Sequence, residues 1–235
     1  MRGILLSENS IGYRHIPKTA CTSIKAALYK LETGKEFSTE EVGMHVHRYY
    51  GKKTTDISDA EFKFIIIRDP IKRFLSSYSN RVKYHGQLSK KYLEKSENGK
   101  LLLKKKTIPV KPSLSDFIRY LNEYLTIPAI RKHTKPTAEW LDKPLEFFDE
   151  VYKIEELYKL EKDISDRTKK EFILPRLQTG GEKISVNELS VKELEFLIDF
   201  YKEDYILLKD FYTVDEIYKT WKENGTQLNH TGTDT

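Results

Sequence analysis

The sequence has a single cysteine among its 235 residues, and it has no long run of apolar residues. One cysteine excludes an internal disulfide and a cysteine-rich zinc site. No apolar run approaches the roughly 20 residues that cross a bilayer, and the apolar patch within residues 1–10 is too short for a signal peptide. We therefore expect a cytoplasmic protein in a reducing compartment, without an integral membrane segment.

Glycine is missing between Gly12 and Gly34, a stretch with the layout of a strand, a turn and a helix. Residues Ile11–Ile16 alternate as in a strand, and helical spacing resumes at Ser23–Leu31. The turn between them holds Lys18 and several hydroxyl residues, next to the positive end of the helix dipole. Backbone N–H groups at such an end bind anions, so the stretch predicts a phosphate-binding turn.

The missing glycines also exclude the commonest phosphate-binding loop. A Walker A loop needs two glycines and a lysine at its end, whereas Lys18 opens this turn. ATP or GTP hydrolysis is therefore disfavoured. A cysteine phosphatase would use Cys21 as a thiolate, but Ala27 stands where its loop needs an arginine. The structural alternative is a capped helix that follows a buried strand.

A second pattern begins at Phe62–Ile67, a nearly continuous apolar run rich in β-branched residues. Such a run predicts a parallel strand that is covered on both faces and lies centrally in its sheet. Asp69 is a good N-cap for a following helix, which places Arg68 at the carboxyl end of the strand, where α/β sheets bind ligands. Arg73 and Ser76 share one helix face, and an arginine fork with a serine hydroxyl can bind a phosphate.

The number of residues between the two patterns indicates how their strands can be arranged. About fifty residues lie between Lys18 and Arg68, enough for a helical crossover between two parallel strands that end side by side. One ligand could then span both patterns. A nucleotide with phosphate groups at its 5' and 3' positions is such a ligand. ATP is not, because it has no 3'-phosphate for the second pattern to bind.

Two histidines stand between the patterns, at His45 and His47. Their spacing of two predicts an extended segment in which both side chains point the same way. Three interpretations remain open. A metal site would need a third ligand with recognisable spacing nearby, structural or surface histidines need no further explanation, and a general base would use the titration of histidine near neutral pH.

Positive charge is concentrated in one segment. The formal net charge is +5, and residues 81–112 carry ten basic and two acidic residues, so this segment has +8 and the remainder −3. It is either a solvated excursion or a surface for an anionic partner. The segment does not show the interleaved aromatic residues that are typical of a surface binding a nucleic acid. A non-enzymatic binder of anionic glycans is therefore one alternative function.

The first pattern, Pro17-Lys18-Thr19-x-x-Thr22-Ser23, resembles the loop that grips the 5'-phosphosulfate of 3'-phosphoadenosine 5'-phosphosulfate (PAPS) in sulfotransferases. The second, Arg68-Asp69-Pro70-x-x-Arg73-x-x-Ser76-x-Tyr78, resembles their motif for the 3'-phosphate. The resemblance is to the carbohydrate branch, with its Golgi-type and bacterial members, and it extends from about Ile11 to Tyr212.

This resemblance implies a P-loop-like α/β fold of three layers, with a central, mostly parallel sheet and helices on both faces. We expect a single domain over residues 1–222, a basic excursion at 81–112 and a flexible tail at 223–235. The implied activity moves a sulfuryl group from PAPS to a hydroxyl of a glycan or glycolipid, leaves 3',5'-adenosine bisphosphate (PAP) as product and needs no metal. Another P-loop-like nucleotide-dependent kinase or hydrolase is the alternative enzyme.

The resemblance also implies the site residues. The family commonly places a catalytic histidine between the phosphosulfate loop and the next core strand, which favours His45 as the base with His47 as the alternate. Lys18 would stabilise charge on the 5'-phosphate and the bridging oxygen. The residues expected to bind the cofactor are Lys18, Thr19, Ala20, Cys21, Thr22, Ser23, Arg68, Ser76 and, from a late loop, Lys183.

Overall fold

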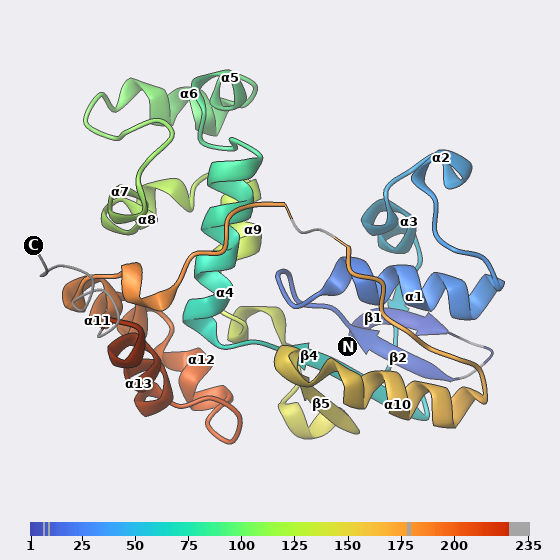
Figure 1. The fold of residues 1–235 in the computed structure, drawn as a ribbon. Coiled ribbons are helices and arrows are strands. Elements are labelled where there is room, and N and C mark those ends of the chain that lie inside the picture. Colours follow the sequence, from blue (N-terminus) through green and yellow to red (C-terminus); the bar gives the residue numbers. More distant parts are fainter. Residues whose placement is uncertain (7, 9, 178–179, 226–235) are drawn as a thin grey trace, which may run out of the picture. The chain divides into compact units, whose positions relative to one another are not determined.

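The computed structural model describes residues 1–6, 8, 10–177 and 180–225 (Figure 1). The chain forms two compact units. The first consists of Met1–Arg68 and Trp140–Thr179, and the second of Asp69–Glu139 and Gly180–Thr235. A single domain over residues 1–222 stays a prediction. Most of the predicted tail, from residue 226 onward, lies outside the described residues.

The first unit is built on a five-stranded sheet of order β3-β1-β2-β4-β5 (Figure 1). Its β2 and β4 are parallel, as are β4 and β5, whereas β1 is antiparallel to both β2 and β3. The sheet is therefore mixed, and the predicted mostly parallel sheet is only partly right. The strands are β1 (Arg2–Leu6), β2 (Ile11–Arg14), β3 (Thr54–Asp56), β4 (Phe62–Ile67) and β5 (Glu150–Lys153).

The antiparallel half follows from a short connection. Strand β1 ends only four residues before β2 begins, and so short a link can join neighbouring strands only in antiparallel fashion. The predicted strand at residues 62–67 is confirmed as β4, which has a parallel neighbour on each side. On this sheet the ring of Tyr13 stacks on Phe64 with centroids 4.8 Å apart.

Helices lie on both sides of this sheet, which confirms the α/β class. Alternate side chains of the strands form one core cluster with α1, α3 and α10, because neighbours such as Tyr13 and Phe64 share that face. On the opposite face, Lys63 reaches the ring of Phe147 in η4. The helices of this unit are α1 (Cys21–Thr33), α2 (Thr39–Val42), α3 (Val46–Lys52), η4 (Leu145–Phe147), η5 (Ile154–Glu156) and α10 (Leu157–Thr168).

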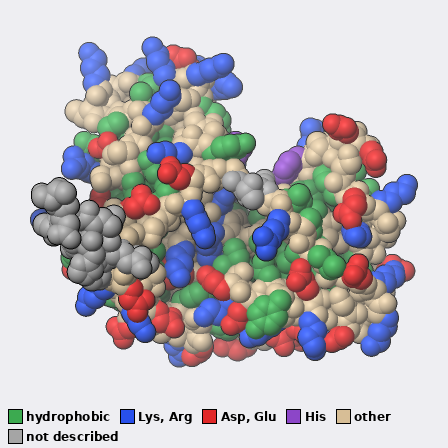
Figure 2. Space-filling model, viewed as in Figure 1, with side chains coloured by type: hydrophobic (Ala, Val, Ile, Leu, Met, Phe, Trp, Pro, Cys, Tyr) green, Lys and Arg blue, Asp and Glu red, His purple; other side chains and the backbone are tan. Residues whose placement is uncertain are grey.

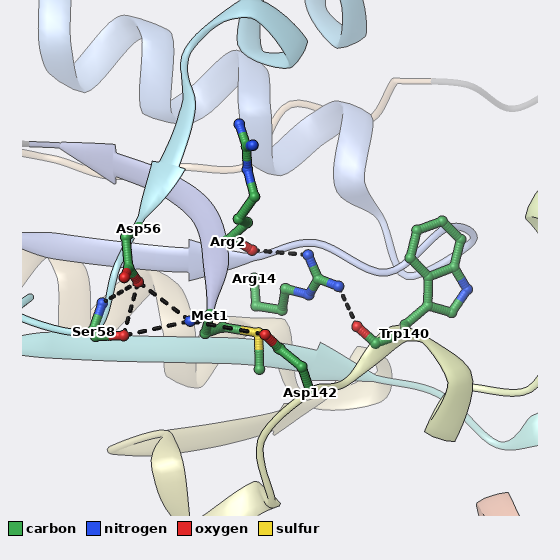
Figure 3. A network of polar contacts seen from close by, with 7 residues as sticks. All are labelled: Met1, Arg2, Arg14, Asp56, Ser58, Trp140 and Asp142. Atoms are coloured by element: carbon green, nitrogen blue, oxygen red, sulfur yellow. Dashed lines mark hydrogen bonds and ion pairs between the residues drawn. The ribbon is translucent and has the colours of Figure 1, made fainter.

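Arg14 holds the carboxyl end of β2 in place (Figure 3). Its guanidinium donates to the carbonyl of Arg2, at 2.8 Å, and to the carbonyl of Trp140. In the same network the Met1 amino group contacts Asp56 at 3.2 Å, and hydrogen bonds from Ser58 and that amino group lower the pKa of Asp56 to about 2. The strand from which the predicted phosphate-binding turn departs is therefore fixed by hydrogen bonds on both of its sides.

The second unit is helical. The ring of Phe74 in α4 stacks on Phe117 of α7 at 5.4 Å and meets Tyr201 at 6.3 Å. The unit contains α4 (Pro70–Ser77), the π-helix η2 (Tyr78–Tyr84), α5 (Lys90–Leu93), α6 (Glu97–Lys104), α7 (Leu114–Arg119), α8 (Leu121–Tyr124), α9 (Pro128–Thr134), η6 (Val186–Glu188), α11 (Val191–Phe200), α12 (Lys202–Leu207) and α13 (Val214–Gly225), while η3 (Ala138–Trp140) stands at the boundary in sequence.

The basic segment 81–112 folds largely as the end of η2 followed by α5 and α6, and Figure 2 shows Lys and Arg side chains gathered over this part of the unit. Two of its lysines pair locally, Lys90 with Glu94 and Lys100 with Glu97. Both pairs are exposed and contribute little to stability. An anionic partner for this surface stays a prediction.

Candidate active site

The turn between β2 and α1 has an unusual backbone. Lys18 and Ala20 both adopt the left-handed conformation, with φ of 72° and 59°. The hydroxyl of the buried Thr19 donates to the carbonyl of Ile16 at 2.8 Å, which closes the turn from inside. The left-handed residues redirect the chain so that α1 begins directly at Cys21.

The start of α1 is suited to an anion. Its N-cap is Ala20, which has no side chain that could accept a hydrogen bond, and the first turn carries no acidic residue. The first backbone bond within the helix runs from Ile24 N to Ala20 O at 3.1 Å. The N–H groups of the three residues before Ile24 therefore have no partner within the helix, and they lie at the positive end of its dipole.

Arg68 brings the second pattern to this turn. It follows β4, which is paired in parallel with β2, so the two strands end at the same edge of the sheet. Its Nη1 donates to the carbonyl oxygen of Lys18 at 3.2 Å. The prediction that two parallel strands end side by side is confirmed, and Lys18 and Arg68 are in contact although fifty positions separate them.

The helix after Arg68 starts as predicted, with the Asp69 side chain accepting from Lys72 N at 2.8 Å. Arg73, however, is fully buried within the second unit. It donates to the carbonyl oxygens of Lys135, at 2.6 Å, and His133, at 3.3 Å, and it pairs with Asp204 at 3.7 Å. Arg73 therefore holds α4 and α9 together, while Ser76 lies half-buried in α4.

The extended segment predicted for the two histidines is wrong, because α3 begins at Val46. His45 is the N-cap of this helix, is exposed, and accepts from the backbone N of His47 at 3.2 Å. The rings of the two histidines still lie close, with centroids 5.1 Å apart. The capping by His45 outweighs the alternating pattern, since it satisfies one of the free N–H groups of the helix.

The structure brings His47, rather than the favoured His45, to the phosphate-binding turn. Its Nε2 lies 3.0 Å from the hydroxyl oxygen of Thr22 and 3.9 Å from the sulfur of Cys21. Its Nδ1 lies 3.2 Å from the ammonium nitrogen of Lys25. The neighbouring Ser23 accepts from the backbone N of Leu177 at 3.3 Å, so both hydroxyl residues of this helical turn have partners.

Lys25 is a functional candidate that the sequence patterns did not reveal. It stands in α1 among buried apolar residues, and only 2% of it is exposed. A lysine is almost never so buried unless it is paired. The one available signal was that Ile24 and Ala26 flank it within an apolar stretch, which leaves a lysine at this position little access to water.

The environment of Cys21 disfavours the thiolate form. Burial raises the pKa of its thiol, and the charges of Lys25 and Lys18 offset only part of this rise. A thiolate nucleophile needs a lowered pKa, so this environment argues against the phosphatase chemistry considered above. Lys18 itself lies in the turn that directly precedes α1.

The remaining candidate, Lys183, is exposed in the second unit. The late loop that carries it was predicted from Thr179, which lies outside the described residues.

Within the described part of the chain no three His, Cys, Asp or Glu side chains form a group that could hold a metal ion. The helices in that part include none with the length and apolar character needed to cross a membrane.

Comparison with protein families gives a match to the sulfotransferase family over residues 4–212. The chain belongs to the sulfotransferase family. The match covers most of the chain and includes both patterns that meet at Lys18 and Arg68. Neither curated proteins nor solved structures gave a match. The mixed α/β sheet is consistent with the P-loop-like fold expected of this sulfotransferase.

Proposed function

We propose that this sulfotransferase moves the sulfuryl group of PAPS onto a hydroxyl of a carbohydrate, in a glycan or a glycolipid. The observation that carries the proposal is the hydrogen bond from Arg68 to the carbonyl of Lys18, which joins the two sequence patterns at one sheet edge. A donor with a 5'-phosphosulfate and a 3'-phosphate has an anionic group for each pattern.

The residues at the turn fit such a donor. The uncapped start of α1, without an acidic residue in its first turn, offers N–H groups to the oxygens of a phosphate. Ala20 and Cys21 are small, so the backbone can approach a bound anion closely. Bound PAPS would supply the activated sulfuryl group, and the chain would supply position and charge, which carry most of the rate in related phosphoryl transfers.

Each predicted residue has a role in this proposal. Lys18 and the N–H groups of residues 19–23 stabilise negative charge on the 5'-phosphate and the bridging oxygen. Arg68 and Ser76 hold the 3'-phosphate, and Lys183 adds a further contact to it. His45 removes the proton of the acceptor hydroxyl, and His47 is the alternate base. No role is assigned to a metal ion.

His45 is the better base because its side chain is exposed and can reorient. Its Nδ1 accepts one hydrogen bond, from the backbone N of His47, and that bond can exchange with water. We expect His45→Ala to lower turnover by about 100-fold or more, in keeping with the usual contribution of general-base catalysis, with little change in PAP affinity. Equal loss of turnover and affinity would contradict this role.

The proposed function is tested by comparing the affinities of the protein for PAP and for ATP. A variant at Arg68 tests the same function. Removing a charged hydrogen bond to the 3'-phosphate costs about 1.5–3 kcal/mol, so Arg68→Ala is expected to weaken PAP binding about 10- to 100-fold. The measurement is isothermal titration calorimetry of both nucleotides with the wild type and the variant. Arg2→Ala, which removes an exposed arginine that bonds Thr54 O, is the matched control.

Two results would overturn the proposed function. One is ATP binding as tight as PAP binding to the wild type, which would favour a kinase or hydrolase. The other is an Arg68→Ala protein that binds PAP as tightly as the control. A positive result leads to a transfer assay with PAPS and a panel of sugar alcohols and glycans.

A further inference from the structure

Three polar side chains form a connected line beneath the start of α1. Lys25 Nζ lies 3.2 Å from His47 Nδ1, and His47 Nε2 lies 3.0 Å from Thr22 Oγ1. Lys25 and Thr22 are both nearly inaccessible, with 2% and 8% exposed. Lys25 and Thr22 stand on α1 and His47 on α3, so the line also joins two helices that pack together.

The direction of each hydrogen bond follows from which of these groups can donate and which can accept. A lysine ammonium has only donors, so it donates to Nδ1 of His47. An imidazolium at this distance from an ammonium would be repelled, so the charge of Lys25 favours a neutral His47 ring with its proton on Nε2. With Lys25 charged, Nδ1 of His47 must accept, so the ring proton is on Nε2 and this N–H donates to the oxygen of Thr22.

The hydroxyl proton of Thr22 is therefore not used in the contact with His47. Because its oxygen accepts from His47, its own hydroxyl proton must be donated to another acceptor. Thr22 is the second residue of α1, next to the N–H groups that have no partner within the helix. An anion held by those groups supplies an acceptor at that place.

We propose that Lys25 and His47 are positioning residues that commit the hydroxyl proton of Thr22 to the anion bound at the start of α1. This inference rests on the proposed function, since that anion is the 5'-phosphate side of PAPS or PAP. The proposal also gives the two histidines different roles. His47 has its Nδ1 occupied by an ammonium and its Nε2 protonated, so it is a donor, and the role of base belongs to His45.

The direction of the hydrogen bonds can be measured without any ligand. In protein labelled with ¹⁵N-histidine, the nitrogen chemical shifts report which ring nitrogen carries the proton. We expect His47 to be the neutral ring protonated on Nε2 at pH 7, with its signals assigned by their loss in His47→Gln. We expect Lys25→Met to give a mixture of both neutral forms. A wild-type ring protonated on Nδ1, or on both nitrogens, would overturn the proposal.

The role toward the anion is tested with matched substitutions. The amide of glutamine can donate to Thr22 and accept from Lys25, but it cannot take up a proton at neutral pH. Loss of one hydrogen bond to a charged group corresponds to about a tenfold loss in affinity, so we expect His47→Ala and Thr22→Val each to weaken PAP binding by about that factor. We expect the double variant to be no weaker than either, and His47→Gln to recover most of the affinity and turnover.

The outcomes separate the two roles of His47 and the two proposals. A His47→Gln protein as defective in turnover as His47→Ala would make His47 the base and overturn the positioning role. Additive losses of PAP affinity in the double variant would also overturn it, because the two residues would then act separately. Failure of the wild type to bind PAP would overturn the proposed function, whereas the NMR result decides the hydrogen-bond direction by itself.

Discussion

Turnover falls at least about 100-fold in a Lys18→Ala protein that keeps its fold. Removing one preorganised electrostatic group from a transfer site typically costs about 10²- to 10³-fold in rate, and Lys18 lies in the turn directly before α1, where the anion is proposed to bind. Alanine keeps the Cβ, so the strain of the left-handed backbone at φ 72° is the same in both proteins. The variant therefore isolates the loss of the ammonium group.

The measurement is single-turnover transfer from PAPS at saturating donor, together with thermal melting of each variant. Lys35→Ala is the control, because Lys35 is exposed in the same unit and carries the same charge. Lys18→Arg is expected to retain part of the rate, since it preserves the charge with a different shape. A Lys18→Ala protein with turnover within about threefold of the control would contradict the role given to this residue.

The free energy of unfolding falls by about 3–5 kcal/mol in Asp204→Ala, because the substitution leaves the Arg73 guanidinium buried without its counter-charge. Both side chains are fully buried at 3.7 Å. Asp204 also accepts from the backbone N–H groups of Thr137, at 2.7 Å, and Ala138, at 2.8 Å. The loss corresponds to a decrease in melting temperature of about 6–20 °C for a chain of this size.

Calorimetric or circular-dichroism melting measures this effect. Asp204→Asn is expected to lose less, because its amide oxygen keeps one acceptor for the backbone. Asp199→Ala is the control, since Asp199 is exposed in α11, and it is expected to change stability by no more than about 0.5 kcal/mol. A melting temperature for Asp204→Ala within 2 °C of this control, which is about 1 kcal/mol or less, would refute the prediction.

Several features of this fold follow from short stretches of sequence. The apolar residues 62–67 form β4, Asp69 caps α4, and Ser38 caps α2 by accepting from Glu41 N. The capping box of Ser190 and Glu193 opens α11. Each of these depends on contacts within a few residues, so local propensity is sufficient to predict them.

Other features depend on neighbours outside the local pattern. The helical run that begins at Val191 is interrupted at Tyr201, where α11 ends and α12 follows. Tyr201 is fully buried and donates to the carbonyl of Thr134, a contact that lies outside any sequence pattern. A buried hydroxyl needs such a partner, and Tyr201 is both the C-cap of α11 and the N-cap of α12.

The sequence alone determined that a turn bearing Lys18 joins β2 to a helix, that Arg68 follows the apolar strand β4, and that these two strands are parallel neighbours. These properties follow from residue type and order, through the apolar periodicity and the length of the crossover. Only the tertiary structure decided that His47 rather than His45 reaches the turn, that Lys25 is buried beneath it, and that Arg73 holds helices together. The reason is physical: a buried charge must find its partner wherever the packed chain provides one, and that partner can come from any part of the sequence.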